Sequence, residues 1–409
     1  MKKNSKQKKI NINLSKVKYN AAELLLIFVM ALVFGILIGE TIFGADTKPI
    51  SLTTSTSSEL YEIKDVYNTI LSEYIDSVDK EKLKEAAING MMSSLKDKHS
   101  MYFNPTQTKQ FQDELNGYFI GVGVAISKES KDSLVTIQKV YKNSPADKAG
   151  IKEKDQLLKI NGKDVTKSST DDISNSIKGK DGETYTILLK RGEEEKEVKV
   201  TTGKVDIPSI TSKIIEEKNK KIGYLAISIF ATNTDEQLKE ELKKLEKENF
   251  KDLIIDLRYN QGGELDAVIN SASEFLDKKV PIIQIKTKKN TDIKYSKGNE
   301  NKKYNIVVLI NKSSASGAEV LAAALNEQLN APLIGDTTYG KGTVQKTKQL
   351  SDGTIIKYTI ETWQTSKGKS IDGKGVKPTI ELKQSEKYYE TIKDEDDAQL
   401  QKAIETLIK

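Results

Sequence analysis

The sequence predicts a multidomain protein of mixed α/β and α+β class, in which a membrane-anchor helix and an amino-terminal helical region precede a small α+β unit and a larger α/β core. Three observations predict this order. An uncharged, strongly apolar run lies near the amino terminus, short strand-like segments separated by turn residues fill the middle, and strand-like and helix-like segments alternate after about residue 208. Such alternation is typical of a partly parallel sheet covered by helices, with sites at the carboxyl ends of its strands.

The composition limits the chemistry available to this chain of 409 residues. It has no cysteine, which excludes disulfides and thiolate metal sites, and one histidine, His99, which excludes a multi-histidine metal site. No metal or organic cofactor is implied. The formal net charge is +6, but seven lysines and no acid lie within residues 1–18, and subtracting them leaves −1 for the rest. A nearly neutral body disfavours an extended phosphate-binding surface, so no nucleic-acid partner is expected.

The apolar run at residues 24–39 predicts a membrane anchor. Together with residues 41–45 it approaches the roughly 20 residues that a helix needs to span a bilayer. The lysine-rich start should stay in the cytoplasm, so we expect a single-pass cell-membrane protein whose larger part is extracytoplasmic. A cleaved signal peptide is the alternative, although residues 43–45 give no clean Ala-x-Ala site. Residues 1–45 are therefore assigned to the basic start and the anchor.

Two further segments precede the folded core. Residues 46–58 are rich in serine and threonine and predict a flexible tether. Residues 59–116 predict a helical region, because apolar residues recur at helical spacing in 60–74 and again in 83–95. A third helix should begin after Asn104, where proline and then glutamine stand at the positions typical of a capping box. Such a region suits docking or a homodimer, or else forms a packed edge of the main body.

Residues 117–204 predict a self-contained α+β unit. Three stretches of it are distinctive: Gly121-Val122-Gly123-Val124, Asn143-Ser144-Pro145-Ala146-x-x-Ala149-Gly150-Ile151 and Asp155-x-Leu157-Leu158-x-Ile160-Asn161-Gly162. In these stretches the unit resembles a PDZ domain. The resemblance implies binding of protein or peptide substrates with free carboxyl termini, whose carboxylate would meet the backbone N–H groups of Val122, Gly123 and Val124 in the loop that begins at Gly121.

Arg191 stands at the end of a strand in this unit, in a chain whose basic residues are almost all lysine. It is a candidate for coupling ligand binding to the active site. The alternative is an ordinary surface ion pair, because arginine suits any planar carboxylate partner.

Residues 205–385 predict the α/β core, in which Ser316 stands at a strand-to-helix junction. Lys341 lies 25 positions later between two glycines, and Gln345 follows four positions on. A serine hydroxyl needs a base to take its proton, and with no cysteine and one histidine the sequence favours lysine by elimination. Lysine can act only when neutral, so burial must lower its pKa from about 10.4 toward neutrality, at a cost of about 4 kcal/mol.

Neighbouring groups could complete this candidate site. If the segment after Lys341 is extended, Gln345 projects to the same side, where its amide can hold the lysine nitrogen without charging it. Acyl transfer also needs N–H donors for an oxyanion, and Gly317 together with Gly262 or Gly263 could supply them if the two turns are adjacent. Taken singly, each piece has an ordinary interpretation as a helix cap, a turn or a loop.

Four motifs together resemble the carboxyl-terminal processing peptidases, also called tail-specific proteases, across nearly all of residues 57–385. They are Asp256-Leu257-Arg258-x-Asn260-x-Gly262-Gly263, Asn311-x-x-Ser314-Ala315-Ser316-Gly317-Ala318-Glu319, Gly335-x-x-x-Tyr339-Gly340-Lys341-Gly342-x-Val344-Gln345 and Gly373-x-Gly375-Val376-x-Pro378-Thr379. The resemblance implies that Ser316 is the nucleophile, Lys341 the base and Gln345 its partner. It also implies that Gly262 and Gly317 donate to the oxyanion. Residues 363–368 lack the proline of the family's Tyr-x-Thr-Pro-x-Gly, which removes no proposed catalytic group.

The resemblance thus implies a membrane-anchored serine endopeptidase that cleaves exported proteins at or near unstructured carboxyl-terminal tails, with tail recognition by the PDZ-like unit. One alternative is a catalytically silent PDZ adaptor tethered to the membrane. A second is a Ser/His hydrolase that uses His99, although the family's pattern gives this position no catalytic role and favours a surface or helix-end histidine. Residues 386–409 predict a carboxyl-terminal helix that packs against the first helices or a second subunit.

Overall fold

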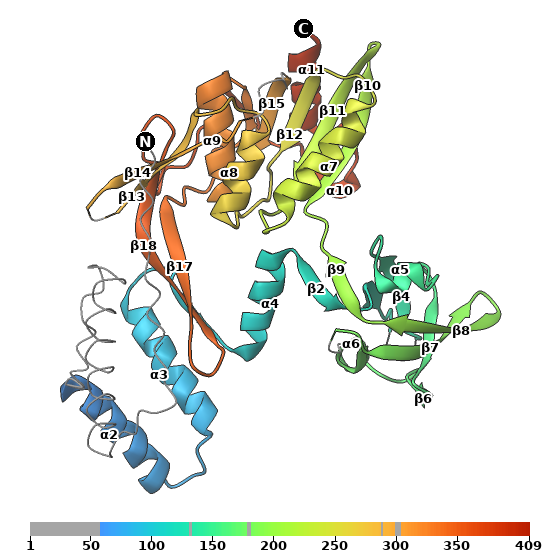
Figure 1. Ribbon diagram of the computed structural model, residues 1–409, viewed down its shortest axis with the longest axis vertical. Helices are drawn as coiled ribbons and strands as arrows, with labels where there is room; N and C mark the ends of the chain where they lie inside the picture. The colour runs from blue at the N-terminus through green and yellow to red at the C-terminus, as the bar shows by residue number, and fades with distance from the viewer. Residues whose placement is uncertain (1–57, 131–132, 178–180, 288, 299–303) are drawn as a thin grey trace, which may run out of the picture. The chain divides into compact units, whose positions relative to one another are not determined.

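The computed structural model describes residues 58–409 except for 131–132, 178–180, 288 and 299–303 (Figure 1). The expected anchor and tether lie outside the described residues, and no helix within the described part is long and apolar enough to cross a bilayer. The chain divides into two compact units, residues 1–83 and 84–409.

Helix α2 (Ser58–Glu73) forms the described part of the first unit together with the start of α3 (Lys80–Ser94). Several apolar side chains of the stripe predicted from the sequence are exposed, including Leu60 at 51%, Ile63 at 48% and Val66 at 60%. The helical spacing was therefore predicted correctly. These side chains are not buried in a core.

The second unit begins with the rest of α3, then β1 (Met101–Phe103) and α4 (Pro105–Asn116). The capping box predicted at the start of α4 is confirmed. Asn104 Oδ1 accepts the Gln107 N–H at 2.9 Å, and Gln107 Oε1 accepts the Asn104 N–H at 3.1 Å. Strand β1 was not expected within the helical region, and it forms because Met101–Phe103 pairs antiparallel with a distant strand, β18.

The PDZ-like unit contains an antiparallel sheet with the order β3-β4-β5-β7-β8, and a short strand β6 that pairs with β5. Its fully buried core includes Ile137, Leu157, Ile187 and Leu189. A ribbon of β2 and β9 leads the chain in and out of the unit. The bounds are β2 (Tyr118–Gly121), β3 (Val124–Ser127), β4 (Thr136–Val140), α5 (Pro145–Lys148), β5 (Gln156–Ile160), β6 (Lys163–Asp164), α6 (Thr170–Ile177), β7 (Thr184–Arg191), β8 (Glu194–Thr201) and β9 (Gly203–Asp206).

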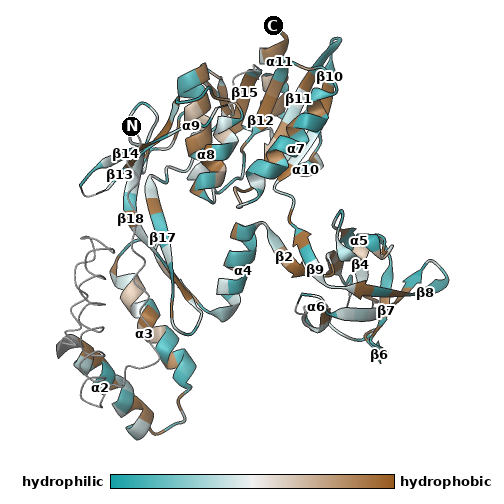
Figure 2. Cartoon of the chain, viewed as in Figure 1, coloured by the Kyte–Doolittle hydropathy of each residue, from teal (hydrophilic) through white to brown (hydrophobic). Residues whose placement is uncertain are grey.

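The core is built on a six-stranded sheet with the order β10-β11-β12-β15-β16-β19, in which only the β10–β11 pair is antiparallel. All five residues of β12 are buried, as expected for a strand that is covered on both faces. Figure 2 shows β12 as hydrophobic and α7 as largely hydrophilic. The bounds are β10 (Ile210–Glu217), β11 (Lys220–Ile227), α7 (Thr234–Glu246), β12 (Asp252–Asp256), α8 (Leu265–Ser273), β15 (Asn305–Ile310), α9 (Gly317–Leu329), β16 (Leu333–Gly335) and β19 (Ile380–Glu381).

Helices cover both faces of this sheet. Residues of α7, α8 and α9 share one apolar cluster with Leu253 and Ile255. On the other face, Leu400 and Ile404 of α11 (Ala398–Ile408) pack with Ile254. The carboxyl-terminal helix therefore packs against the core sheet, which the sequence analysis did not name as its partner, because the alternate residues of the buried strands offer an apolar face that α11 covers.

A second sheet flanks the core, with the order β1-β18-β13-β14 and with β17 paired to β18. Strands β17 (Thr343–Gln349) and β18 (Ile355–Thr365) form a hairpin that carries the segment after Lys341. The remaining elements are β13 (Pro281–Lys286), β14 (Thr291–Tyr295), α10 (Glu386–Thr391) and the short 3-10 helix η2 (Asp394–Asp396).

Candidate active site

The turns after β12 and β15 meet at one edge of the sheet, because the two strands are adjacent and parallel. A Cβ atom placed on Gly262 would lie 2.8 Å from both Ser316 Cβ and the Gly317 nitrogen. Gly262 also has a φ of +99°, so glycine is required here for both its conformation and its close approach. The expected adjacency of the two turns is confirmed.

Ser316 stands immediately before the first residue of α9. Its backbone has φ 52° and ψ −113°, a conformation that residues other than glycine rarely adopt. Its backbone N–H donates to Glu319 Oε2 at 2.8 Å, which helps to stabilise this conformation. The next N–H group, that of Gly317, has no acceptor among the described residues. An uncommitted amide beside a serine at a helix start is suited to binding a developing negative charge.

Glu319 connects the serine turn to the lysine turn. Its side chain is fully buried, and its carboxylate accepts the backbone N–H groups of Ser316, Gly340 at 2.7 Å and Lys341 at 2.9 Å. The Thr338 hydroxyl also donates to it. In the sequence analysis Glu319 appears only as the last residue of a family motif, and no role was predicted for it. An acidic residue in the first turn of an otherwise apolar helix was the available signal for its role.

Lys341 is held by further contacts and is partly buried. Its carbonyl oxygen accepts the Trp363 Nε1–H at 2.8 Å, which adds a second contact that fixes the turn. Burial lowers the pKa of the Lys341 amine, and the charge of Lys357 lowers it further, whereas Asp97 and Glu319 act in the opposite direction. The net direction is the one that a lysine base requires.

The predicted catalytic and oxyanion residues line one cavity of about 630 Å³, namely Ser316, Lys341, Gln345, Gly262 and Gly317. Apolar side chains from the core and from residues 101–115 form much of its wall: Met101, Phe103, Phe111, Leu115, Val268, Ile283, Val320 and Trp363. No hydrogen bond joins the Ser316 hydroxyl to the Lys341 amine among the described residues. Catalytic hydrogen bonds often become short only in the complex with substrate.

Gln345 lies in the cavity wall on β17, but its amide nitrogen is bonded to hydroxyl groups. Nε2 donates to Thr343 Oγ1 at 2.8 Å and to Thr359 Oγ1 at 3.2 Å. No described group donates to its carbonyl oxygen, Oε1. The amide therefore presents an acceptor, and that is the end of the group that a neutral lysine amine can use as a partner.

The two candidate glycines after β12 differ in their hydrogen bonds. The Gly262 N–H donates to Asn260 Oδ1 at 2.8 Å, so it could bind an oxyanion only if this bond opened. The Gly263 N–H has no acceptor among the described residues, and its carbon packs tightly against the Phe230 carbonyl. Gly263 therefore offers the less committed amide of the pair.

His99 lies closer to this site than the sequence suggested. It is partly buried, and its ring meets the Tyr339 ring edge-on at a centroid distance of 6.3 Å. Burial lowers the pKa of His99, and the charges of Lys341 and Lys98 add to this effect. No hydrogen bond joins His99 to Ser316 within the described part of the chain, so the structure gives the Ser/His alternative no support.

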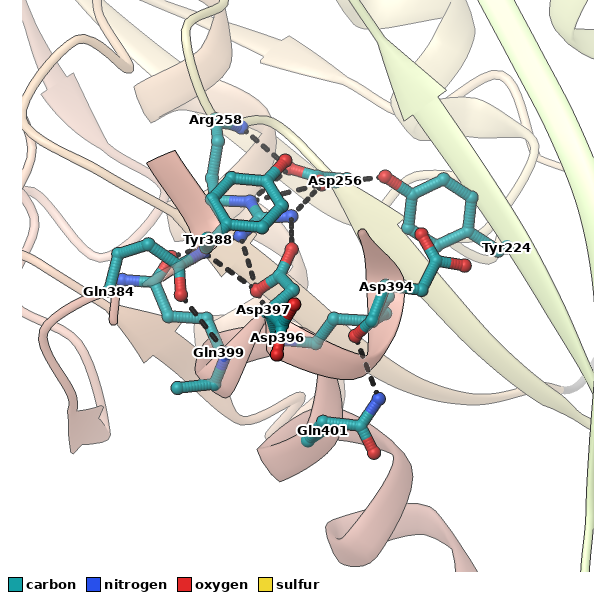
Figure 3. Close-up of polar contacts among 12 residues, drawn as sticks. Tyr224, Asp256, Arg258, Gln384, Tyr388, Asp394, Asp396, Asp397, Gln399 and Gln401 are labelled. Atoms are coloured by element: carbon teal, nitrogen blue, oxygen red, sulfur yellow. Dashed lines mark hydrogen bonds and ion pairs between the residues drawn. The ribbon is translucent and has the colours of Figure 1, made fainter. Parts of the chain in front are cut away.

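Arg258 belongs to a structural network rather than to the cavity (Figure 3). Only 6% of its side chain is exposed, and it forms ion pairs with Asp256 at 2.7 Å and Asp397 at 2.8 Å. The Tyr224 hydroxyl donates to Asp256 at 2.7 Å, and Gln399 accepts from Arg258 at 3.1 Å. Since Asp397 caps α11 and Asp256 ends β12, the network fastens the last helix to the strand that leads to the glycine turn.

The PDZ-like unit places its predicted ligand loop between two strands. The carbonyl groups of Val122 and Gly123 accept N–H groups of Ala146 and Tyr141, at 2.8 and 3.0 Å. The N–H groups of Val122 and Gly123 have no acceptor among the described residues. Arg191 pairs with Asp155 of the same unit at 2.7 Å, as the ion-pair interpretation expected.

Fold and site together define a serine hydrolase with a PDZ-like unit, and comparisons with known proteins agree. Peptidase family S41 matches residues 221–382, a PDZ domain matches 119–202, and the activating protease CtpB N-terminal domain matches 45–107. A "Probable CtpA-like serine protease" of Staphylococcus haemolyticus is 36% identical over 362 residues, which cover 88% of this chain and 72% of the relative. A protein of the same name from Staphylococcus aureus is 36% identical over 334 residues, covering 81% of this chain and 66% of the relative.

The chain belongs to peptidase family S41. It is a serine protease that carries a PDZ domain, which confirms the resemblance to carboxyl-terminal processing peptidases. Among solved structures, a photosystem II D1 C-terminal processing protease matches with a TM-score of 0.46 and 25% identity, covering 80% of this chain and 94% of that one.

Proposed function

We propose that this protease is an endopeptidase with a Ser/Lys dyad, in which Ser316 is the nucleophile and Lys341 the general base. The observation that carries the proposal is the convergence of the two side chains on one cavity, with burial lowering the pKa of Lys341. Glu319 supports it further, because one buried carboxylate binds the backbone at both residues.

The reaction follows from these positions. Neutral Lys341 accepts the Ser316 proton as the hydroxyl oxygen attacks the peptide carbonyl carbon. The oxyanion is stabilised by the Gly317 N–H and by that of Gly262 or Gly263. The peptide C–N bond then breaks, and protonated Lys341 gives its proton to the leaving amine. A water molecule, deprotonated by the same lysine, hydrolyses the acyl ester and frees Ser316.

Substrate selection belongs to the PDZ domain in this proposal. β3 is an edge strand of the PDZ sheet, to which an extended peptide could add. The uncommitted amides of Val122 and Gly123 lie immediately before it and suit a terminal carboxylate. Exported proteins with unstructured carboxyl-terminal tails are the substrates that we propose.

We also place the enzyme at the cell membrane as a single-pass protein with its catalytic part outside the cytoplasm. The apolar run and the lysine-rich start support this orientation, and alkaline extraction of membranes tests the anchor. A homodimer through residues 59–116 remains a prediction, supported by the exposed apolar side chains of α2.

Cleavage of a denatured protein, followed by electrophoresis, tests the proposed function. Wild-type enzyme should cut, whereas Ser316→Ala and Lys341→Ala should abolish cleavage and leave the fold intact. A substrate with an amidated carboxyl terminus should be cut more slowly than the free acid, because the PDZ loop loses the charge that it binds.

Two matched controls accompany this experiment. Ser313→Ala changes an exposed serine in the same turn, and Lys348→Ala changes an exposed lysine on the same hairpin, so both should keep the wild-type rate. Full activity of Lys341→Ala would refute the dyad. Tail binding by the wild-type enzyme without any cleavage would instead favour the silent adaptor.

A further inference from the structure

A hydrogen-bonded chain leads from the candidate catalytic amide to a carboxylate that no catalytic motif includes. Gln345 Nε2 donates to Thr359 Oγ1 at 3.2 Å, and Thr359 Oγ1 donates to Asp97 Oδ2 at 2.6 Å. Asp97 lies in the loop before β1, more than two hundred residues from its partner in the sequence. The chain therefore joins the amino-terminal part of the second unit to the active-site hairpin.

Strand pairing brings these residues together. Gln345 and Thr359 are cross-strand partners in the β17–β18 hairpin, and the register shifts between Val344 and Gln345. A bulge at this point re-aims the side chain that follows it. β1 pairs with the other edge of β18, from Met101 opposite Lys357, so the loop before β1 lies beside Thr359.

Asp97 can act only as an acceptor in this chain. Its carboxylate receives the His99 N–H at 2.9 Å and the hydroxyl groups of Ser100 and Thr359, each at 2.6 Å. Burial by itself raises the pKa of Asp97, but these hydrogen bonds outweigh it and lower that pKa to about 2. The group is thus ionised at any working pH and has no proton to donate.

The direction of every bond in the chain follows from this charge. A threonine hydroxyl has one proton, and that of Thr359 is committed to Asp97, so its oxygen can only accept. The Gln345 group facing it must therefore be the NH₂, which leaves the carbonyl oxygen Oε1 as the free end of the amide. A carbonyl oxygen can accept from the Lys341 amine and cannot compete for its lone pair, which then remains available for the Ser316 proton.

We propose that Asp97 and Thr359 are positioning residues that fix the orientation of the Gln345 amide and thereby the direction in which Lys341 accepts a proton. This inference rests on the proposed function of the site. It gives Asp97 a positioning role in the proposed reaction, which the sequence analysis did not predict.

Thr359→Val tests the proposal most cleanly, because it removes the hydroxyl and keeps the shape of the side chain. We expect kcat to fall on the order of 10- to 100-fold, as for other misplacements near 1 Å, with KM within about 2-fold of wild type. Thr359→Ser restores the hydroxyl and should restore most of the rate. Asp97→Asn should also lower kcat, because an amide can donate to Thr359 and allow the chain to reverse.

A matched control exists in the PDZ domain. Asp164 accepts the Thr166 hydroxyl at 2.6 Å, the same contact in an exposed position far along the chain from the protease motifs. Asp164→Asn should leave kcat unchanged. If Thr359→Val loses its fold by circular dichroism, Asp97→Asn carries the test alone.

A double-mutant cycle separates positioning from general destabilisation. In a Gln345→Ala background, Thr359→Val should lower kcat no further, because its effect passes through the amide. The inference would be overturned if the effects of Gln345→Ala and Thr359→Val on kcat multiply in the double variant. A folded Thr359→Val enzyme with wild-type kcat would also overturn it. Lys341→Ala in the same assay shows which proposal has failed. If Lys341→Ala is inactive, the dyad stands and only the role given to Asp97 and Thr359 is wrong. If Lys341→Ala is active, the dyad itself is wrong.

Discussion

At the residue scale, the proposed mechanism depends on keeping one lysine neutral. Burial supplies the main effect on the pKa of Lys341, and Lys357 adds a second positive charge at the same cavity wall. The Lys357 ammonium lies 5.2 Å from the Phe103 ring centroid and 5.3 Å from that of Phe111, and none of the described carboxylates forms an ion pair with it. No neighbouring carboxylate among the described residues therefore neutralises this charge, and it lowers the pKa of Lys341.

This arrangement predicts a shifted pH profile for Lys357→Met. Removing the positive charge raises the pKa of Lys341, and since the base works only when neutral, the acid limb of kcat/KM should move to higher pH. We expect a shift of about 0.5–1 pH unit for the loss of one nearby positive charge. The pH dependence of kcat/KM measures it, with Lys348→Met as the control. An unchanged limb would show that the two lysines do not interact.

At the scale of single elements, α11 stabilises the edge of the core sheet at which the candidate active site lies. The helix covers one face of the sheet through Leu400 and Ile404, and its cap residue Asp397 shares Arg258 with the end of β12. The strand that leads to the glycine turn is therefore fixed at its last residue. Helix α11 is thus part of the core itself.

Arg258→Met should destabilise the protein, because it leaves Asp256 and Asp397 buried without their partner. Breaking a buried pair in this way typically costs about 3–5 kcal/mol of the free energy of unfolding. Urea denaturation measures the loss. Lys221→Met, which removes the exposed pair with Glu248, is the control and should change the midpoint little. Equal midpoints for the two variants would contradict the role given to the network.

At the scale of the whole molecule, local patterns in the sequence predicted local structure well. The capping box at Asn104 and the alternation of strands and helices in the core need only short-range rules, and the spacing of Ser316, Lys341 and Gln345 was enough to select one cavity. The family resemblance added the choice of Gly262, rather than Gly263, as the expected second oxyanion donor.

Two other features that depend on pairing between distant segments were not predicted. Strand β1 exists because three residues find β18, and only that pairing brings Asp97 to Thr359. The role of Glu319 likewise requires the lysine turn to fold back onto α9. A buried acid or threonine has no local pattern that reveals its partner, so coordinates were needed for both.

The central claim is that Lys341 activates Ser316, and covalent labelling of Ser316 measures this most directly. An active-site-directed phosphonate probe, followed by mass spectrometry of the digested protein, reports the rate at which that one hydroxyl reacts. The account predicts rapid labelling of Ser316 in the wild type, with a rate constant that rises with pH through the pKa of the base. It predicts no labelling of Ser316 in folded Lys341→Ala. Equal labelling in both proteins, or labelling confined to another serine, would contradict it.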